Sequence, residues 1–361
     1  MNETVKESAA MEEGWAVKPW ELLLPPVIPA VVGREVAVYF DNLIAGNASR
    51  YDFDVETPVG LHRNDGWVWL PDQAGDYPLT VEVYAEEGTR LARASTVVRV
   101  KPAEAEADAS AASISVPLLR AALFIGDSTT AAGHYTAELL RLFSLNPSKR
   151  LVLIGTKGAK PNVHEGRGGW RVDQFAEHEE SPFVFDGRFD FSRYMKENGL
   201  APNDGWPALT HVGIHLGIND IFHAEDERFE QILTERMSML ESMIAGIRAY
   251  DGRIRIGMMT VIPPSRNQDS FAASYGSLQS RRRYKRKWAK WNRELLLRFV
   301  ERSDVEIVPT HVVLDSTHNM PVASSPVNAC NAATIVRQND GVHPAVGGYQ
   351  QMADMLYAWL I

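Results

Sequence analysis

The sequence contains the run Leu118-Leu119-Arg120-Ala121-Ala122-Leu123-Phe124-Ile125, which leads directly into Gly126-Asp127-Ser128-Thr129-Thr130. The first eight of these residues form a short apolar run of the length expected for a buried strand. Glycine then permits a sharp turn, and polar residues follow at once. The later sequence holds four more apolar runs of this kind, at residues 151–154, 211–216, 254–262 and 305–308.

Helical patterns alternate with these apolar runs. The clearest pattern has apolar residues at three- and four-residue spacings, which lie on one face of a helix: Phe229, Ile232, Leu233, Met237, Leu240, Ile244 and Ile247. Residues 136–143, 281–300 and 348–360 are further helix candidates. Apolar strands that alternate with helices predict a parallel sheet covered on both faces. Ligands of such sheets bind at the carboxyl ends of the strands, so we expect the chemistry there.

The first hundred residues have a different pattern. Short alternating or β-branched runs occur at residues 35–41, 51–55, 67–70, 78–85 and 91–100, with no helical periodicity between them. We therefore predict a small β-sandwich of the immunoglobulin or fibronectin kind over residues 17–101. A tail (1–16) precedes it, a polar linker (102–115) follows it, and the α/β domain takes residues 116–361.

Composition excludes several classes of protein. The 361 residues carry a net charge of −9, which argues against a nucleic-acid partner. Cys330 is the single cysteine, so no internal disulfide or cysteine metal site can form. No apolar run is long enough to span a membrane. Residues 1–13 lack the apolar core of a signal peptide, so we expect either a cytoplasmic protein or a record that begins after a removed signal.

Three polar groups follow predicted strands or precede the last helix. Ser128 lies at the start of a helix, where backbone N–H groups can stabilise an oxyanion, although Asp127 or Ser128 could simply cap that helix. Asn219, in Gly217-Ile218-Asn219-Asp220, can donate its amide to an oxyanion or serve in a turn. Asp340 and His343 are spaced so that the carboxylate can orient the imidazole as a base for a serine, or they form an incidental surface pair.

These blocks, taken in order, resemble the SGNH (GDSL-type) hydrolase superfamily. Gly126-Asp127-Ser128 looks like its nucleophile block, residues 217–220 like its Gly-x-Asn-Asp block, and residues 340–344 like its Asp-x-x-His block. The resemblance covers about residues 118–361 and implies a flavodoxin-like parallel sheet between helices. One departure is Thr129, where many members carry Leu or Ile.

The resemblance implies roles for individual residues. Ser128 would be the nucleophile, His343 the base and Asp340 its orienting partner. The oxyanion would be held by Ser128, Asn219 and a backbone glycine, for which we favour Gly169, with Gly168 as the alternative. The resemblance implies no metal and no cofactor. Expected substrate-binding residues are Asp127, Trp170 and Arg171.

The expected function is that of a serine esterase acting on O-acyl groups, mainly O-acetyl groups, of carbohydrate. The string of residues 164–170 ends in Gly-Gly-Trp and resembles esterases that deacetylate sugars, and tryptophan offers a platform for sugar rings, unless Trp170 belongs to the core. Alternatives are a lipid or thioester hydrolase of the same superfamily and a non-catalytic carbohydrate-binding protein. The oligomeric state stays open.

Two other features have plainer interpretations. Residues 281–287 are strongly basic, and we interpret them as the solvated face of a helix, with binding of an acidic polysaccharide as the alternative. His211 and His215 share a face of one predicted strand without a third ligand, so we expect a packing role for them.

Overall fold

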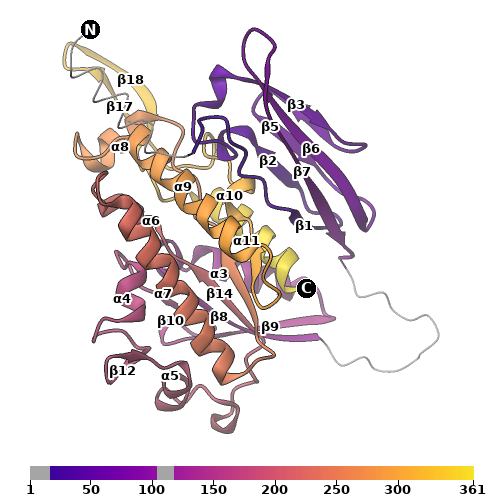
Figure 1. Ribbon diagram of the computed structural model, residues 1–361, viewed down its shortest axis with the longest axis vertical. Helices are drawn as coiled ribbons and strands as arrows, with labels where there is room; N and C mark the ends of the chain where they lie inside the picture. The colour runs from indigo at the N-terminus through magenta and orange to yellow at the C-terminus, as the bar shows by residue number, and fades with distance from the viewer. Residues whose placement is uncertain (1–16, 104–117) are drawn as a thin grey trace.

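The computed structural model describes residues 17–103 and 118–361 (Figure 1). Its centre is a sheet with the strand order β10-β11-β8-β14-β15-β16, in which β9 also pairs with β8. Every pairing in this sheet is parallel except β10 with β11. The strands are β8 (Leu118–Gly126), β9 (Lys149–Ile154), β10 (Lys157–Ala159), β11 (Asn162–Gly166), β14 (His211–His215), β15 (Arg255–Met259) and β16 (Glu306–Val308). The mixed α/β class with a parallel sheet is therefore confirmed.

Helices cover both faces of this sheet. On one face α11 packs against α3, and on the other α7 packs against α9 (Figure 1). The apolar residues expected on one side of α7 are buried, apart from half-buried Ile232, because their spacing matches the helical repeat. The helices are α2 (Ser128–Ala131), α3 (His134–Ser144), α4 (Val172–Ala176), α5 (Phe191–Glu197), α6 (Ile218–His223), α7 (Phe229–Tyr250), α8 (Gln268–Tyr275), α9 (Arg281–Phe299), α10 (Thr310–Val313) and α11 (Val346–Leu360).

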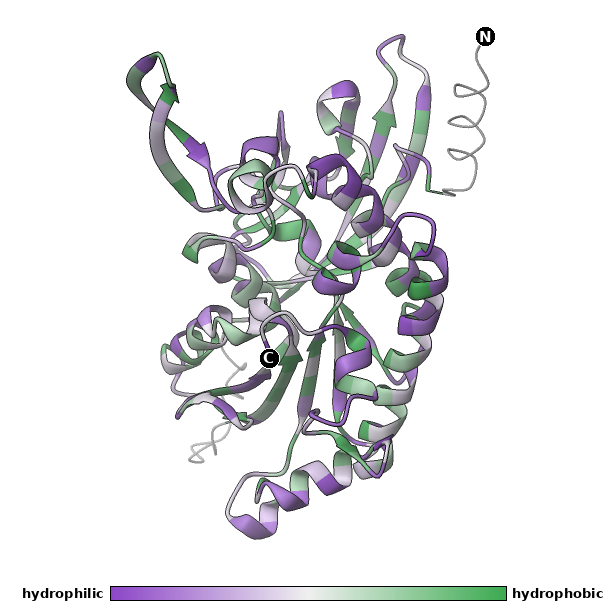
Figure 2. Ribbon diagram, turned by 90° about the vertical axis from the view of Figure 1, so that its left-hand side faces the viewer, coloured by the Kyte–Doolittle hydropathy of each residue, from purple (hydrophilic) through white to green (hydrophobic). Residues whose placement is uncertain are grey.

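The central strands are apolar over most of their length, as Figure 2 shows by their green colour. Two short hairpins lie outside the central sheet. The hairpin of β12 (Val184–Phe185) and β13 (Arg188–Phe189) precedes α5. The hairpin of β17 (Val322–Asn328) and β18 (Asn331–Gln338) stands away from the body of the molecule in both views, and most of its residues are exposed (Figures 1 and 2).

The N-terminal part of the chain forms two further sheets. One has the strand order β1-β7-β6-β3, and the other has the order β2-β5-β4. The tail and almost all of the expected linker lie outside the described residues, and the separate sandwich domain stays a prediction. The strands are β1 (Val27–Val31), β2 (Val36–Tyr39), β3 (Asp52–Glu56), β4 (Leu61–Arg63), β5 (Gly66–Trp69), β6 (Gly75–Tyr84) and β7 (Arg90–Lys101), with the short 3-10 helices η1 (Phe40–Asn42) and η2 (Ala48–Arg50) beside them; η3 (Pro202–Asp204) lies in the α/β part.

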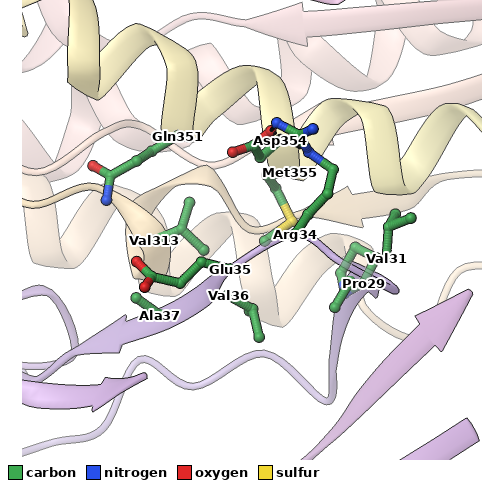
Figure 3. Close-up of a pocket in the computed structure, with 11 residues that line it drawn as sticks. Pro29, Val31, Arg34, Glu35, Val36, Ala37, Val313, Gln351, Asp354 and Met355 are labelled. Atoms are coloured by element: carbon green, nitrogen blue, oxygen red, sulfur yellow. Dashed lines mark hydrogen bonds and ion pairs between the residues drawn. The ribbon is translucent and has the colours of Figure 1, made fainter. Parts of the chain in front are cut away.

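These N-terminal sheets pack directly on the α/β part. The buried Asn42 amide donates to the carbonyls of His311 and Leu314, at 2.8 Å each. The buried His311 ring in turn bonds to the Leu23 carbonyl at 2.8 Å. Figure 3 shows a second contact, where Arg34 reaches Asp354 of α11. Buried apolar residues from both parts form one continuous core.

The basic start of α9 faces solvent only in part. Arg282 and Arg283 are exposed, as expected for a solvated face, but Lys285 and Lys287 are buried, so the interpretation is wrong for these two lysines. Lys285 is 2% exposed and lies 2.7 Å from Asp41 of η1, while Arg281 reaches the other oxygen of Asp41 at 2.6 Å. Lys287 is also buried and pairs with Asp226. η1 thus covers the side of the helix that carries Lys285. The cluster of Asp41, Arg281 and Lys285 is a buried charged link between the two parts.

Replacing Asp41 with Asn should lower the free energy of unfolding by about 3–5 kcal/mol, because it leaves two buried cations without their counter-ion. Chemical denaturation measures the loss. Asp76→Asn is a matched control, since the Asp76–Arg99 pair is about half exposed on both sides and exposed ion pairs contribute little to stability. Equal losses in the two variants would contradict a structural role for the buried cluster.

Candidate active site

Three neighbouring strands of the central sheet end in one row. Gly126, the last residue of β8, pairs with Gly166 of β11 on one side and with His215 of β14 on the other. Because all three strands are parallel, the chain leaves each of them toward the same edge of the sheet. The segments that start with Asp127, Arg167 and Leu216 therefore emerge next to one another.

The tight turn at the end of β8 positions Ser128. A side chain at Gly126 would collide with Thr130 Oγ1 and approach the His215 carbonyl, so glycine is required there. Asp127 then caps α2, with its Oδ1 accepting a hydrogen bond from the Thr129 N–H at 3.0 Å. The serine is the first residue of this four-residue helix. Its side chain is half-buried at the carboxyl edge of the sheet.

The structure brings Ser128, His343 and Asp340 together in one hydrogen-bonded chain. Ser128 Oγ lies 2.8 Å from His343 Nε2, and His343 Nδ1 lies 3.1 Å from Asp340 Oδ2. With Nδ1 protonated toward the carboxylate, Nε2 is free to accept the serine proton. Ser128 precedes Asp340 and His343 by more than 200 positions in the sequence, so the fold brings the serine to the other two residues.

The turn that carries Asp340 is held by its own carboxylate. Asp340 Oδ1 accepts hydrogen bonds from the N–H groups of Val342 and His343, at 2.9 and 2.8 Å, which leaves Oδ2 for the imidazole. The hydrogen bond to Asp340 raises the pKa of His343 above its ordinary value, although burial opposes the shift. Burial also works against ionisation of Asp340, but hydrogen bonds from His343 and from the turn hold the pKa of that carboxyl below its usual range.

The Asp-x-x-His spacing is not sufficient by itself. Asp315 and His318 have the same spacing and a similar contact, with His318 Nδ1 2.9 Å from Asp315 Oδ2. The side chain of His318, however, is 71% exposed, and no serine hydroxyl bonds to it among the described residues. Only the pair at 340 and 343 faces a serine at a strand end.

The expected oxyanion donors lie on the two segments that flank Ser128. Gly169 has a φ of +79°, and a side chain there would meet nothing within 4 Å. Within residues 17–103 and 118–361, the N–H groups of Gly168 and Gly169 find no acceptor. Asn219 Nδ2 donates to the Trp170 carbonyl at 3.0 Å, so the amide lies against the segment that carries both glycines.

The position of Asn219 depends on two neighbours. Gly217 caps α6 at a φ of +134°, and a side chain there would collide with the Trp291 indole. Asp220 is buried and accepts hydrogen bonds from the Val172 N–H and from Arg236 Nε, the latter at 2.9 Å. Burial raises the pKa of Asp220 to about 6 despite Arg236. Asp220 thus ties α6 to α4 and α7, a role that the sequence motif does not reveal.

A second buried carboxylate supports the glycine segment. Glu165 is fully buried and accepts hydrogen bonds from the Thr156 N–H at 2.6 Å and the Tyr194 hydroxyl at 2.8 Å. It also pairs with Arg167 at 3.2 Å, and the Arg167 N–H donates to the Gly126 carbonyl. Sequence reasoning missed Glu165 and Tyr194, because nothing in the pattern marks a buried acid as a support for its neighbours.

Asp127 does not fit the expectation of a substrate-binding residue. Its side chain is fully buried, so no bound molecule can touch it in this conformation. Burial raises the pKa of Asp127 to about 7, and nearby His343 opposes that shift. One oxygen of its carboxyl group, Oδ1, accepts the hydrogen bond that caps α2. The plainer alternative, that Asp127 caps a helix, matches the structure.

Trp170 and Arg171 are half-buried at the edge of the site. The Trp170 ring packs edge-on against Phe175 at 5.0 Å, and the Arg167 guanidinium lies 4.9 Å from its centroid. Arg171 pairs with Asp173 at 3.1 Å. Both side chains therefore have partners within the protein, and their contact with a substrate stays a prediction.

The histidine pair of β14 shows no metal-site geometry. The pKa of His211 is lowered to about 3 and that of His215 to about 4, because both rings are buried. In the part of the chain that the structure describes, no three His, Cys, Asp or Glu side chains gather as metal ligands would. None of the helices in that part is both long and apolar enough to cross a bilayer.

Replacing Asp340 with Asn should lower the pKa of His343, because the neutral amide no longer stabilises the imidazolium. An NMR titration of the His343 ring protons measures the shift. Asp315→Asn is the matched control: it alters the exposed Asp-x-x-His pair and should leave the titration of His343 unchanged. A pKa of His343 that is the same in the wild type and in Asp340→Asn would contradict the described hydrogen bond.

Comparison with known proteins finds similarity at the level of structure. No protein-family model matches this chain, and no curated protein matches its sequence. Among solved structures, a family 3 carbohydrate esterase from Clostridium thermocellum is 16% identical, with a TM-score of 0.40 over 66% of this chain and 94% of that one.

Two other solved structures show a similar degree of likeness. A carbohydrate acetylesterase from Sinorhizobium meliloti is 13% identical, with a TM-score of 0.37 over 66% of this chain and 96% of that one. A lipase from a goat rumen metagenome is 13% identical, with a TM-score of 0.35 over 66% and 95%. This chain is thus similar in structure to carbohydrate esterases and lipases, and the inference of its function rests on the geometry of its own site.

Proposed function

We propose that this protein is a serine ester hydrolase of the SGNH type that removes O-acyl groups, mainly O-acetyl groups, from carbohydrate. The observation that carries the proposal is the hydrogen-bonded chain Ser128–His343–Asp340, with distances of 2.8 and 3.1 Å. A serine hydroxyl is a weak nucleophile unless a base removes its proton. The position of this chain at the carboxyl edge of a parallel sheet also agrees with where such sheets bind ligands.

The reaction follows from the roles of these groups. Ser128 Oγ attacks the ester carbonyl while His343 Nε2 takes the hydroxyl proton. Asp340 stabilises the imidazolium that forms. His343 then gives the proton to the leaving alcohol, so that an acyl group remains on Ser128. In the second half, His343 deprotonates a water molecule, which attacks the acyl group and releases the acid.

The negative charge that develops on the carbonyl oxygen needs donors. We assign this role to the N–H groups of Ser128 and Gly169 and to the side chain of Asn219. The amide of Asn219 carries two N–H bonds, and one of them is used by the Trp170 carbonyl, so the second is available. Loss of one such donor typically costs about 10²–10³ in kcat.

Replacing Ser128 with Ala should lower kcat for p-nitrophenyl acetate by about 10⁴ or more, since the nucleophile, base and orienting acid act as a unit. Release of p-nitrophenol measures it. Ser238→Ala is the control, because Ser238 is an exposed serine on α7 whose hydroxyl donates to the Thr234 carbonyl, away from the site. A folded wild type that turns over no short ester would instead favour the non-catalytic carbohydrate-binding protein.

The value of kcat/KM should fall as the pH falls through the pKa of His343, because only the neutral imidazole can accept the serine proton. Since the hydrogen bond to Asp340 raises that pKa, the decline should begin at a higher pH than the ordinary histidine value of about 6.5 would give. A pH series of initial rates checks this. Rates that stay level from pH 8 down to pH 5 would contradict His343 as the base.

The acyl preference separates the two kinds of ester substrate. We expect p-nitrophenyl esters of two to four carbons to be hydrolysed and longer ones to be rejected, with acetate released from acetylated polysaccharide. A preference for acyl chains of eight or more carbons would assign the enzyme to lipid esters instead.

A further inference from the structure

An opening that takes no part in the proposed reaction lies at the N-terminal sheets. It is a cavity of about 580 Å³ formed by residues of η1, η2, β3, the β4–β5 turn and Arg266. We call it the β-side pocket. Its volume is in the range of small-molecule sites in proteins, roughly 300–1,000 Å³. It contains residues from both parts of the chain, because Arg266 belongs to the α/β part.

Aromatic rings form the apolar part of the β-side pocket. Phe53 stacks flat on buried Phe40, with ring centroids 4.4 Å apart and an interplanar angle of 2°. His62 meets Phe40 edge-on at 5.4 Å, and Tyr51 is half-buried beside them. Rigid aromatic surfaces of this kind suit the apolar faces of sugar rings, since they offer contact area at little cost in conformational entropy.

The charges around the pocket are balanced. Asp41, at its floor, is already neutralised by Arg281 and Lys285. The remaining charged groups are two acids, Asp52 and Asp65, and two arginines, Arg63 and Arg266. All four line the opening, and among the described residues none of them has an ion-pair partner. Carboxylates and guanidinium groups bind vicinal hydroxyls well, and their balance favours a neutral ligand over an anionic one.

The pocket is also connected to the turn that carries the catalytic base. Arg266 follows Ser265, whose N–H donates to the Gly341 carbonyl at 2.9 Å, between Asp340 and His343. Arg281 joins the same point to the floor of the pocket, since its Nε donates to the Ser265 carbonyl at 3.1 Å while its guanidinium pairs with Asp41. A polymer held in the β-side pocket would therefore be anchored one loop away from the site.

We propose that the β-side pocket is a secondary binding site for a neutral oligosaccharide chain, which holds a polysaccharide while its acyl groups are removed. The link to catalysis rests on the proposed function, but the binding itself does not. The pocket supplies an aromatic floor for one sugar ring and four charged side chains for its hydroxyls. This gives the N-terminal sheets a part in substrate selection.

The test uses the full-length Ser128→Ala protein, which cannot consume its ligand. Isothermal titration calorimetry with unacetylated xylohexaose, mannohexaose and cellohexaose should detect binding of at least one. Arg63→Ala and Asp52→Ala, both exposed side chains, and Phe53→Ala should each weaken that binding about tenfold. The matched control is Trp206→Ala, which removes an aromatic ring from a different opening near Lys160 and should leave the affinity unchanged.

Several outcomes would overturn the proposal. They are the absence of binding of all three oligosaccharides at millimolar concentration, an affinity in the Arg63→Ala and Asp52→Ala variants that equals that of the parent Ser128→Ala protein, or tighter binding of an oligogalacturonate than of every neutral chain. Hydrolysis of p-nitrophenyl acetate by the wild type is measured separately. A protein that cleaves esters but fails the calorimetry disproves the pocket alone, and one that binds sugar without turnover disproves the esterase alone.

Discussion

The whole site depends on the alignment of three adjacent strand ends. Hydrogen bonds across the sheet place the last residues of β11, β8 and β14 in one row. From that row one segment supplies a hydroxyl, the second supplies backbone N–H groups and the third supplies an amide. A shift of one residue in either pairing would turn every side chain of that strand to the opposite face of the sheet. The proposed chemistry therefore depends on backbone pairing before it depends on any individual side chain.

Buried acids keep these segments in place around Ser128. Asp127 caps the helix that begins with the serine, Glu165 supports the glycine segment and Asp220 fixes the start of α6. Asp127 and Asp220 are the sequence neighbours of Ser128 and Asn219, whereas Glu165 acts through Arg167 in the segment that leads to Gly169, and all three acids are fully or almost fully buried. Such groups are stable in an apolar interior only when hydrogen bonds or cations satisfy them. The site is thus held by polar groups that a bound ester would never touch.

The sequence predicts much of this fold because its signals are local. The apolar runs that become β8, β14 and β15 and the helical stripe of α7 depend only on period and length, and the serine, amide and imidazole follow from motifs. What the sequence does not contain is the identity of tertiary neighbours. The lysines of α9 were assigned to solvent, since a helix pattern cannot show that η1 and its Asp41 cover the other side. The sequence also contains no sign that Asp127 is buried, because its burial results from packing around the end of β8. It was therefore expected to bind substrate.

The contact between the N-terminal sheets and the α/β part limits how this protein could be engineered. The carbonyls of His311 and Leu314, in α10 and directly after it, are satisfied by Asn42 from outside the α/β part. Cutting the chain in the linker would strip these groups of their partner and open the shared core to water. A chimera that grafts another module onto residues 118–361 would therefore need to rebuild that amide contact first.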